Sequence, residues 1–213
     1  MQPVIRDASP EDAGAIAYLA HMAGQGNARI STYDLIVPGR HGPTPDRIYM
    51  IKRVVAAETV CMLHYSHHCI ADIDGRVAAC VGAVDAPGAG LLSFIAALKE
   101  TGWTDEEITR MRSGVNSYSR VEPPVPKRAI ALENVAALPE YRRRGLVSML
   151  VERTLEAARD GGYERVHLAC HMGNDAAFDL YEKLGFKVDT VRTDPEFEAL
   201  FGCPGMLEMS LAL

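Results

Sequence analysis

The sequence lacks any run of roughly 18 apolar residues, the length that a membrane-spanning helix requires. Its opening segment, MQPVIRDASPEDAG, lacks the basic and then apolar order of a signal peptide. Positive charge is not in excess either, because the formal net charge is −6 at pH 7. Without a bulk positive field, the chain has no general attraction for nucleic acid or for an anionic membrane. We therefore expect a cytoplasmic protein with neither nucleic acid nor membrane among its partners.

The five cysteines are odd in number and irregular in spacing. Four of them lie in apolar or strand-like runs, which favours buried, reduced thiols over a disulfide framework. The segment CMLHYSHHC (residues 61–69) invites a zinc-binding interpretation, but its spacings do not match the usual pairs of ligands. On a strand that begins at Ser66, His67 and His68 would point to opposite faces. We expect no metal site there, and a histidine that faces the substrate is the better hypothesis; a metal-binding regulator is the weaker alternative.

The composition predicts one domain, because 213 residues with 48% hydrophobic and 23% charged side chains can form one sizeable core. Residues 86–126 interrupt the pattern between a PGAG start and a proline-rich VEPPVP end, with helix-like pieces over 91–99 and 105–112. We interpret residues 1–213 as a single domain with a helical insertion at about 86–126. Trp103, the one tryptophan, lies in this insertion and could act as a lid or an interface anchor.

Local signals predict the elements of the first half. Ser9 and Pro10 are typical of an N-cap and a first helical position, and Asp74-Gly75 suits the tight turn of a hairpin. The stretch 24–45 is rich in glycine and proline and is predicted to be a loop. The expected elements are a strand over 4–7, a helix from 13, a helix over 46–58, and a hairpin with strands 68–73 and 76–84.

The second half alternates strands and helices. We expect strands over 129–138 and 165–170, helices over 145–159 and 175–184, and closing strands over 186–192 and 206–213. A strand, a helix and a second strand in succession indicate a parallel pair joined by a crossover. The fold class is therefore α/β.

Three arginines stand directly before a glycine in ENVAALPEYRRRGLVSMLVE, residues 133–152. A strand that ends at Pro139 and a helix that begins near Gly145 would leave free backbone N–H groups at the positive end of a helix dipole. Arg142, Arg143 and Arg144 add cations, and Gly145 permits close approach of a phosphate. The alternative is an arginine run on a solvated helix start. A nucleotide-binding GxxxxGK loop is absent.

Two motifs give a family resemblance. VAALPEYRRRGLVSML resembles motif A of the GNAT superfamily of N-acetyltransferases, with Arg142, Gly145 and Val147 at the three signature positions. Val147 departs from the usual glycine or alanine, and its side chain would face the diphosphate. NDAAFDLYEKLGF, residues 174–186, is similar to the family's NxxAxxLYxKxGF segment at every stated position. Together with the opening IRDASPEDAGAIAYLA, the resemblance spans most of the chain outside 24–45 and the insertion.

The resemblance implies a GNAT fold, with a mixed, mostly antiparallel central sheet, a splayed parallel strand pair and flanking helices. It also implies acetyl-coenzyme A (acetyl-CoA) as the donor and transfer of acetyl to a primary amine by direct attack in a ternary complex. The acceptor could be a small molecule or a peptide, and homodimers are common in the family. The residues that it assigns to the cofactor are Val135, Ala136, Ala137, Arg142, Arg143, Arg144, Gly145, Leu146, Val147, Ser148 and Asn174.

Two residues are candidates for catalysis. The resemblance makes Tyr181 the general acid, and the i, i+4, i+7 spacing of Ala177, Tyr181 and Leu184 turns it toward the cleft; the alternative is a packing tyrosine. Glu133 is the candidate base, and strand alternation predicts that it lies on the same side as Val135. Alternatively, Glu133 only binds a substrate cation or a neighbouring arginine.

Other interpretations remain open at this point. The segment from His167 to His171 could provide a cysteine nucleophile, although we expect Cys170 to be a core thiol. A second function is an acyl-CoA sensor or partner-binding module without transferase activity, which Val147 would favour. The identity of the acceptor does not follow from the sequence, because the segments that determine it carry no motif.

Overall fold

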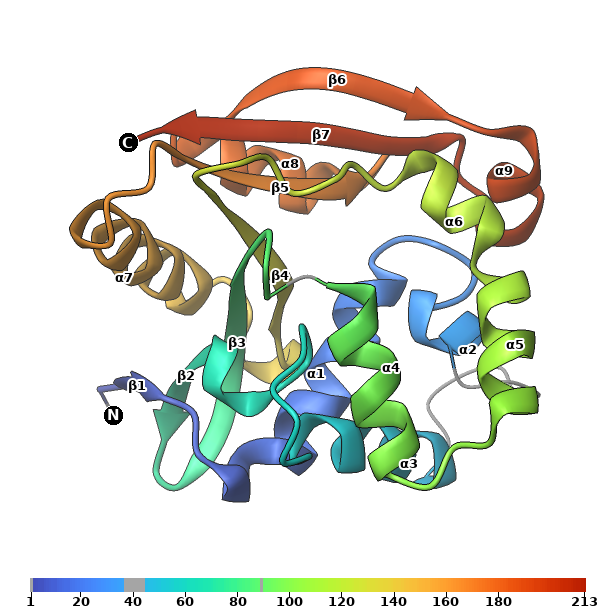
Figure 1. Ribbon diagram of the computed structural model, residues 1–213. Coiled ribbons are helices and arrows are strands. Elements are labelled where there is room, and N and C mark those ends of the chain that lie inside the picture. Colours follow the sequence, from blue (N-terminus) through green and yellow to red (C-terminus); the bar gives the residue numbers. More distant parts are fainter. Residues whose placement is uncertain (1, 37–44, 89) are drawn as a thin grey trace.

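The computed structural model describes residues 2–36, 45–88 and 90–213. Seven strands form one sheet in the order β1-β2-β3-β4-β5-β7-β6 (Figure 1). Only β4 and β5 pair in parallel, and all other neighbours are antiparallel. The predicted mixed, mostly antiparallel sheet is therefore confirmed. The strands are β1 Val4–Asp7, β2 His68–Ile73, β3 Arg76–Asp85, β4 Ala129–Ala137, β5 Arg165–His171, β6 Lys187–Thr193 and β7 Gly205–Ala212.

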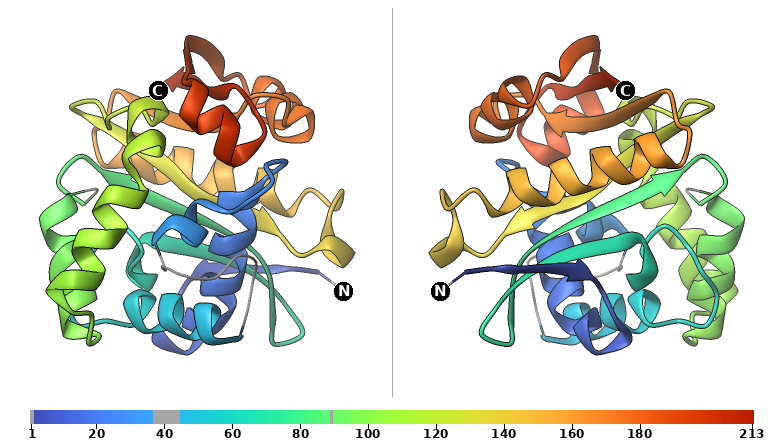
Figure 2. Two further views of the ribbon diagram at one scale, coloured as in Figure 1. Left: turned by 90° about the vertical axis from the view of Figure 1, so that its right-hand side faces the viewer. Right: turned by 90° about the vertical axis from the view of Figure 1, so that its left-hand side faces the viewer.

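Helices cover both faces of the sheet. α7 packs on β2, β3 and β4 from one side, and α1 contacts β4 and β3 from the other (Figure 2). The helices are α1 Ala13–Gln25, α2 Thr32–Ile36, α3 Pro45–Val55, α4 Leu91–Glu100, α5 Asp105–Gly114, α6 Asn116–Val121, α7 Leu146–Asp160, α8 Asp175–Lys183 and α9 Pro195–Phe201.

The sheet separates two hydrophobic cores. On the α7 side, Leu146, Leu150, Val151, Leu155 and Ala158 form one buried stripe that packs on the strands. On the α1 side, a second core joins α1, α3, α4 and α5 to the sheet. The apolar stripe of α7 thus fixes the direction of this helix, which follows the turn that contains Arg142, Arg143 and Arg144.

Most predicted elements are confirmed within a few residues, including the hairpin and the parallel pair around α7. Three short helices, α2, α6 and α9, are not predicted. With five to seven residues each, they are too short for apolar periodicity to be recognised. The stretch 24–45 is therefore not simply a loop, since α2 lies in it; residues 37–44 lie outside the described residues. The second predicted helix spans 45–55 rather than 46–58.

The parallel pair is joined along only a short length. Ala129, Ile130 and Ala131 pair with β5, and no later residue of β4 does so. β5 continues to His171 and stays paired with β7 along its whole length. Beyond Ala131 the two strands therefore splay, as predicted, and the edge of β4 that faces β5 has no strand partner there.

Several smaller expectations have a clear outcome. All five cysteines are free and buried, as predicted. Trp103 is only 6% exposed and belongs to the core on the α1 side, so the expectation of a lid or interface anchor is wrong. Among the described residues, no helix combines the length and apolar character needed to span a bilayer.

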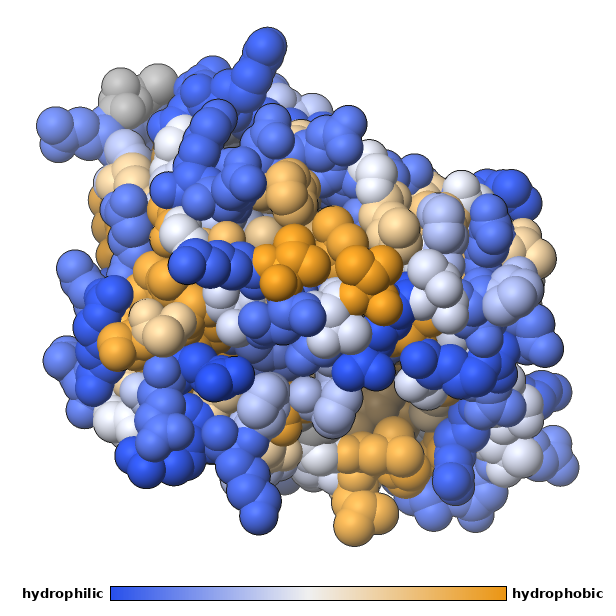
Figure 3. All heavy atoms as spheres, turned by 90° about the horizontal axis from the view of Figure 1, so that it is seen from above, coloured by the Kyte–Doolittle hydropathy of each residue, from blue (hydrophilic) through white to orange (hydrophobic). Residues whose placement is uncertain are grey.

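The edge strand β6 has an exposed outer surface. Val188 and Val191 are 42% and 53% exposed. Figure 3 looks onto the side of the molecule where β6 and β7 lie, and apolar side chains gather there within a mainly hydrophilic surface.

Candidate active site

The turn between β4 and α7 presents a row of unpaired backbone donors. After a 3-10 turn at Pro139–Tyr141, Arg143 and Gly145 adopt left-handed conformations with φ of 60° and 76°. None of the backbone N–H groups from Arg143 to Ser148 has a backbone acceptor among the described residues. A Cβ on Gly145 would meet no atom within 4 Å, so the space beside the turn is open. This arrangement can bind a phosphate group.

The three arginines differ in their contacts. Arg142 Nε donates to the carbonyl oxygen of Ala137 at 3.2 Å. The Arg144 guanidinium lies 5.1 Å from the centroid of the Tyr141 ring and donates to the Glu140 carbonyl, so it folds back toward the 3-10 turn. Arg143 is exposed. The turn therefore combines fixed backbone donors with exposed guanidinium groups.

The first residues of α7 turn their side chains inward. Leu146 is buried, and Val147 packs against the core on the α7 side. Because Val147 is only half-buried, the expectation that its side chain faces the diphosphate stays a prediction. The half-buried Ser148 completes the first turn of the helix.

A β-bulge in β4 changes the orientation of Glu133. Gly82 of β3 pairs with Glu133, whereas Cys80 pairs with Ala136, so β4 contains one extra residue between these pairs. Asn134 adopts a left-handed conformation with φ of 53° at this point. Strand alternation is interrupted there, and Val135 packs on the α7 side while Glu133 faces the opposite side. The predicted common side for Glu133 and Val135 is therefore wrong.

Polar side chains hold the bulge. The Tyr33 hydroxyl donates to Asn134 Oδ1 at 2.6 Å, and Asn134 Nδ2 lies 3.3 Å from His68 Nε2. The Cys80 thiol donates to the Asn134 carbonyl. A Cβ on Gly82 would lie 3.0 Å from His68 Nε2, so a larger residue there would have to displace this ring. Tyr33, His68 and Gly82 therefore support Asn134 from three separate segments.

The histidines of segment 61–69 have a structural role. β2 begins at His68, as predicted, directly after a 3-10 turn that ends at His67, so a strand does not start as early as Ser66. Burial lowers the pKa of His68 to about 4, which keeps the ring neutral. His68 does not line the cavity described below, and the hypothesis of a substrate-facing histidine is wrong for this residue. The described residues contain no group of His, Cys, Asp or Glu that could hold a metal ion.

A buried ion pair anchors the short helix that carries Tyr33. Asp34 accepts hydrogen bonds from Arg47 of α3 and from the Ser31 backbone, and it lies 2.9 Å from His21 Nε2 of α1. All these side chains are buried. Because breaking such a pair leaves an uncompensated charge, the position of α2 relative to α1 and α3 is firmly fixed.

A cavity of about 260 Å³ opens where β4 and β5 splay. Residues from α1, α2, α4, α5, α6 and α8 complete its walls. Of the predicted site residues, Glu133, Val135, Asn174 and Tyr181 lie around it. The remaining ones, Ala136, Ala137 and residues 142–148, lie further along β4 and in the turn beyond it. The chain thus brings together the side-chain candidates, and β4 leads from them to the backbone donors.

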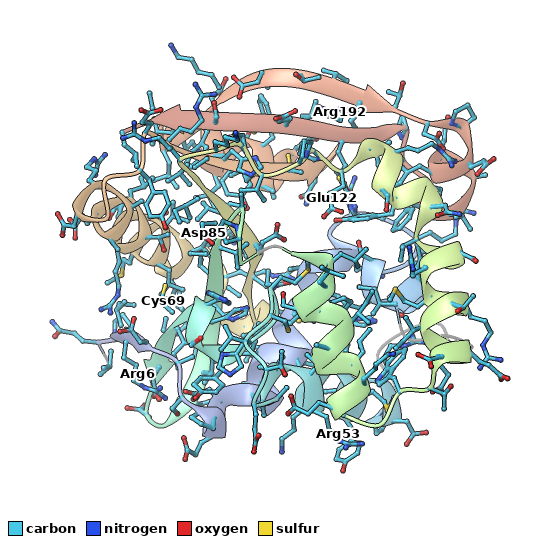
Figure 4. The ribbon with its side chains drawn as sticks, in the orientation of Figure 1. Arg6, Arg53, Cys69, Asp85, Glu122 and Arg192 are labelled. Atoms are coloured by element: carbon cyan, nitrogen blue, oxygen red, sulfur yellow. The ribbon has the colours of Figure 1, made fainter. Side chains whose placement is uncertain are left out.

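Two carboxylates face this cavity. Burial, followed by repulsion from Glu122, raises the pKa of the half-buried Glu133 to about 8. Glu122 follows α6 at the opening (Figure 4) and keeps an exposed surface. The protein walls around it displace part of its water and raise its pKa to about 7. A carboxylate with a pKa near neutrality can accept a proton from an ammonium group.

Tyr181 lies in the inner wall of the cavity. Its side chain is 6% exposed and packs edge-on against Phe186. Its hydroxyl has no hydrogen-bond partner among the described residues and is not fully enclosed. Burial raises the pKa of Tyr181 well above its ordinary value, so the hydroxyl carries its proton at neutral pH. It can therefore act as a proton donor.

Cys170 lines the same wall, but it is not suited to act as a nucleophile. Burial raises its pKa to about 11, which leaves the thiol protonated and weakly reactive. The expectation of a buried thiol is confirmed, although one side of it borders the cavity.

Sequence reasoning misses three residues of the site. Glu122 stands in the proline-rich end of the predicted insertion, and Tyr33 lies in the predicted loop. Asn134 lies on a strand whose bulge has no local signal beyond the tolerance of asparagine for left-handed backbone. Only the hydrogen bonds between distant segments reveal their roles.

The comparison with known proteins identifies the family. Residues 38–186, more than half of the chain, match the acetyltransferase (GNAT) family. The chain belongs to this family. A 61-residue segment of this GNAT protein is 39% identical to the ribosomal protein bS18-alanine N-acetyltransferase of Salmonella typhimurium, and it covers 29% of the chain and 41% of that relative. The chain thus matches less than half of the length of this relative.

Solved structures share the GNAT fold over the whole chain. An N-acetyltransferase of Staphylococcus aureus Mu50 is 21% identical with a TM-score of 0.70, and the match covers 99% of this chain and 100% of that one. The PaiA N-acetyltransferase of Thermoplasma acidophilum, solved in complex with coenzyme A, is 15% identical with a TM-score of 0.54 and full coverage of both chains. At such identities the likeness shows the fold alone.

Proposed function

We propose that this protein is an acetyl-CoA-dependent N-acetyltransferase that moves an acetyl group to a primary amine by direct attack in a ternary complex. Membership of the family supports acyl transfer, and a neighbour of the same fold is solved with coenzyme A. The acetyl thioester would supply an activated acyl group. The protein residues would supply binding, orientation and proton transfer.

The turn from Arg142 to Ser148 would bind the diphosphate of the coenzyme. Its backbone N–H groups lack acceptors, and Gly145 leaves open space beside them. Val135, Ala136 and Ala137 would face the pantetheine arm along the free edge of β4, where small side chains leave room. Asn174, at the N-cap of α8, would complete the site from the opposite wall.

Glu133 would act as the general base. Its pKa of about 8 lies close to the working range for removal of a proton from an ammonium group. It lines the cavity where β4 separates from β5, next to the proposed thioester contacts.

Tyr181 would act as the general acid toward the departing sulfur. Its hydroxyl is protonated and free of partners among the described residues, and the residue borders the same cavity. Protonation of a thiolate is only a modest requirement, because the thiolate is a weak base.

The single observation that carries the proposal is the row of unpaired N–H groups at the end of a strand that has splayed from its neighbour. The test is release of coenzyme A thiol from acetyl-CoA with a panel of small amines and peptide N-termini. Intersecting initial-velocity patterns would agree with a ternary complex, and parallel patterns would contradict it. Coenzyme binding without turnover of any acceptor would contradict the enzyme and favour a sensor.

A further inference from the structure

The cavity contains a second carboxylate that acetyl transfer itself does not require. Glu122 follows α6, and Glu133 lies on β4, so the two acids reach the cavity from different elements. They are close enough for Glu122 to raise the pKa of Glu133 through repulsion. Two neighbouring carboxylates are costly to ionise together unless a cation lies between them.

No cation of the described chain fills this role. The cavity is lined by neither lysine nor arginine, and neither glutamate forms an ion pair among the described residues. Other acids in or near the core do have such partners, for example Asp34 with Arg47 and Asp12 with Arg6. A counter-charge for the two glutamates would therefore have to come from a ligand that enters the cavity.

The rest of the lining indicates the shape of that ligand. Apolar side chains, including Ile36, Met62, Phe94 and Met111, form much of the wall around the acids. Tyr181, a residue only 6% exposed, also lines the cavity, and its hydroxyl lacks a partner among the described residues. An apolar chain with positive charge at both ends would match this combination of walls and acids.

We propose that the acceptor is a small amine with a second positive charge, which Glu122 binds at the mouth while Glu133 faces the reacting nitrogen. This inference rests on the proposed function. In the reaction, the nitrogen–acetyl bond forms and the sulfur–acetyl bond breaks. One ammonium proton passes to Glu133 before the attack. As the sulfur–acetyl bond breaks, the Tyr181 proton passes to the departing sulfur, and the second proton of the nitrogen restores the Tyr181 hydroxyl. The second ammonium group remains charged and bound to Glu122 throughout.

The test compares acceptors that differ only in the charge of the far end. Acetylation is measured for α,ω-diamines from diaminopropane to diaminohexane, each beside the amino alcohol and the amino acid of the same chain length. The assay runs at about pH 8.5, above the pKa of about 7 of Glu122, so that this side chain is ionised. At the best chain length, we expect kcat/KM for the diamine to exceed that for the amino alcohol by at least roughly tenfold. The amino acid should be the poorest acceptor.

Variants locate the effect. In Glu122→Gln the preference for the diamine over the amino alcohol should become small. What remains should only reflect that a diamine has two amines that can react, whereas an amino alcohol has one. Glu122→Asp, which keeps the charge, should retain part of it. Glu106→Gln changes an exposed glutamate of α5, on the neighbouring helix, and should keep the wild-type preference. Thermal melting and coenzyme A binding verify that each variant is folded.

Equal rates for diamine and amino alcohol in the wild-type protein would overturn the inference, as would a preference that survives Glu122→Gln. A peptide with an N-terminal alanine that is acetylated better than every diamine would also overturn it, while the proposed function would stand. If coenzyme A itself fails to bind, the proposed function fails, and the inference fails with it.

Discussion

The turn of residues 142–148 and the cavity between β4 and β5 are built in opposite ways. The turn is exposed, and its donors are backbone N–H groups supplied by one continuous stretch, residues 143–148. The cavity is lined by residues from six helices and three strands, and its charged groups are carboxylates. One site therefore suits an anion, and the other suits a cation.

This difference explains how one chain can bind two ligands of opposite charge. Backbone donors need only the correct conformation, which Gly145 and the inward packing of Val147 provide locally. Carboxylates in a cavity need support from distant segments, and Tyr33, Asn134 and His68 give it to β4. Mutations in the turn should thus affect coenzyme affinity, and mutations around the cavity should affect the chemical step.

The largest effect is expected for Glu133→Gln. Loss of the base should lower kcat/KM by roughly 100- to 1000-fold, within the range for general bases. In the wild-type protein, activity should rise with pH through an apparent pKa of about 8, because Glu133 must lose its proton to act. The variant should lose this rise, while its affinity for coenzyme A should stay near the wild-type value. Steady-state kinetics over a pH series measures both.

Glu152→Gln, an exposed position on α7, is the control and should keep the wild-type pH profile. The raised pKa of Glu133 has a second consequence. Its contribution to stability is fully present below the ordinary carboxyl pKa and is lost as pH rises through about 8. The melting temperature of the wild-type protein should therefore fall as pH rises from the ordinary carboxyl pKa through about 8, and it should fall less in Glu133→Gln. An unmoved pH–rate profile in Glu133→Gln would remove the base role.

Tyr181→Phe should lower kcat by roughly 10- to 1000-fold, because the departing sulfur loses its proton donor. Tyr181 borders the cavity and not the turn that would bind the diphosphate. Loss of its hydroxyl should therefore leave the affinity for coenzyme A nearly unchanged. Tyr49→Phe, at an exposed tyrosine of α3, should have no effect. If kcat in steady-state assays is the same with and without the Tyr181 hydroxyl, then Tyr181 is only a packing residue.

Gly145→Ala should weaken coenzyme A binding by about tenfold. A Cβ at φ of 76° costs roughly 1–2 kcal/mol, and it would enter the open space beside the donors. Gly162, at the other end of α7, has φ of 73° and equally open surroundings. Gly162→Ala should therefore lower the melting temperature similarly and leave calorimetric coenzyme affinity intact. Equal loss of affinity in both variants would mean that strain in α7, not the turn, controls binding.

Tyr33→Phe should have the smallest effect. It removes the 2.6 Å hydrogen bond to Asn134, which is worth about 1 kcal/mol. The melting temperature should fall by roughly 2–4 °C. Because the bulge turns Glu133 toward the cavity, kcat should also fall by a few fold, with coenzyme affinity unchanged. A loss of coenzyme affinity instead would show that the bulge supports the turn rather than the base.

The sequence predicts the turn well because its signals are local. The arginines, Gly145 and the apolar stripe of α7 lie in one stretch, and helix-end physics needs nothing else. The order of strands around α7 follows for the same reason.

The cavity could not be predicted in this way. The bulge at Asn134 depends on Tyr33 and His68, which stand 101 and 66 residues away along the chain. A strand without a bulge would place Glu133 on the other face, which explains the wrong prediction for its side. Glu122 lies just after a six-residue helix that has no readable period. Among the missed elements, α9 did carry a signal, since Asp194 caps it before Pro195.

The central claim is that backbone amides of the turn bind a diphosphate. The most direct measurement is isothermal titration of the wild-type protein with coenzyme A and, separately, with pantetheine, which lacks the diphosphate. We expect one saturable site per chain for coenzyme A and an affinity for pantetheine that is lower by at least roughly tenfold, since charge-assisted hydrogen bonds are lost. No saturable heat with coenzyme A, or equal affinity for both compounds, would contradict the account.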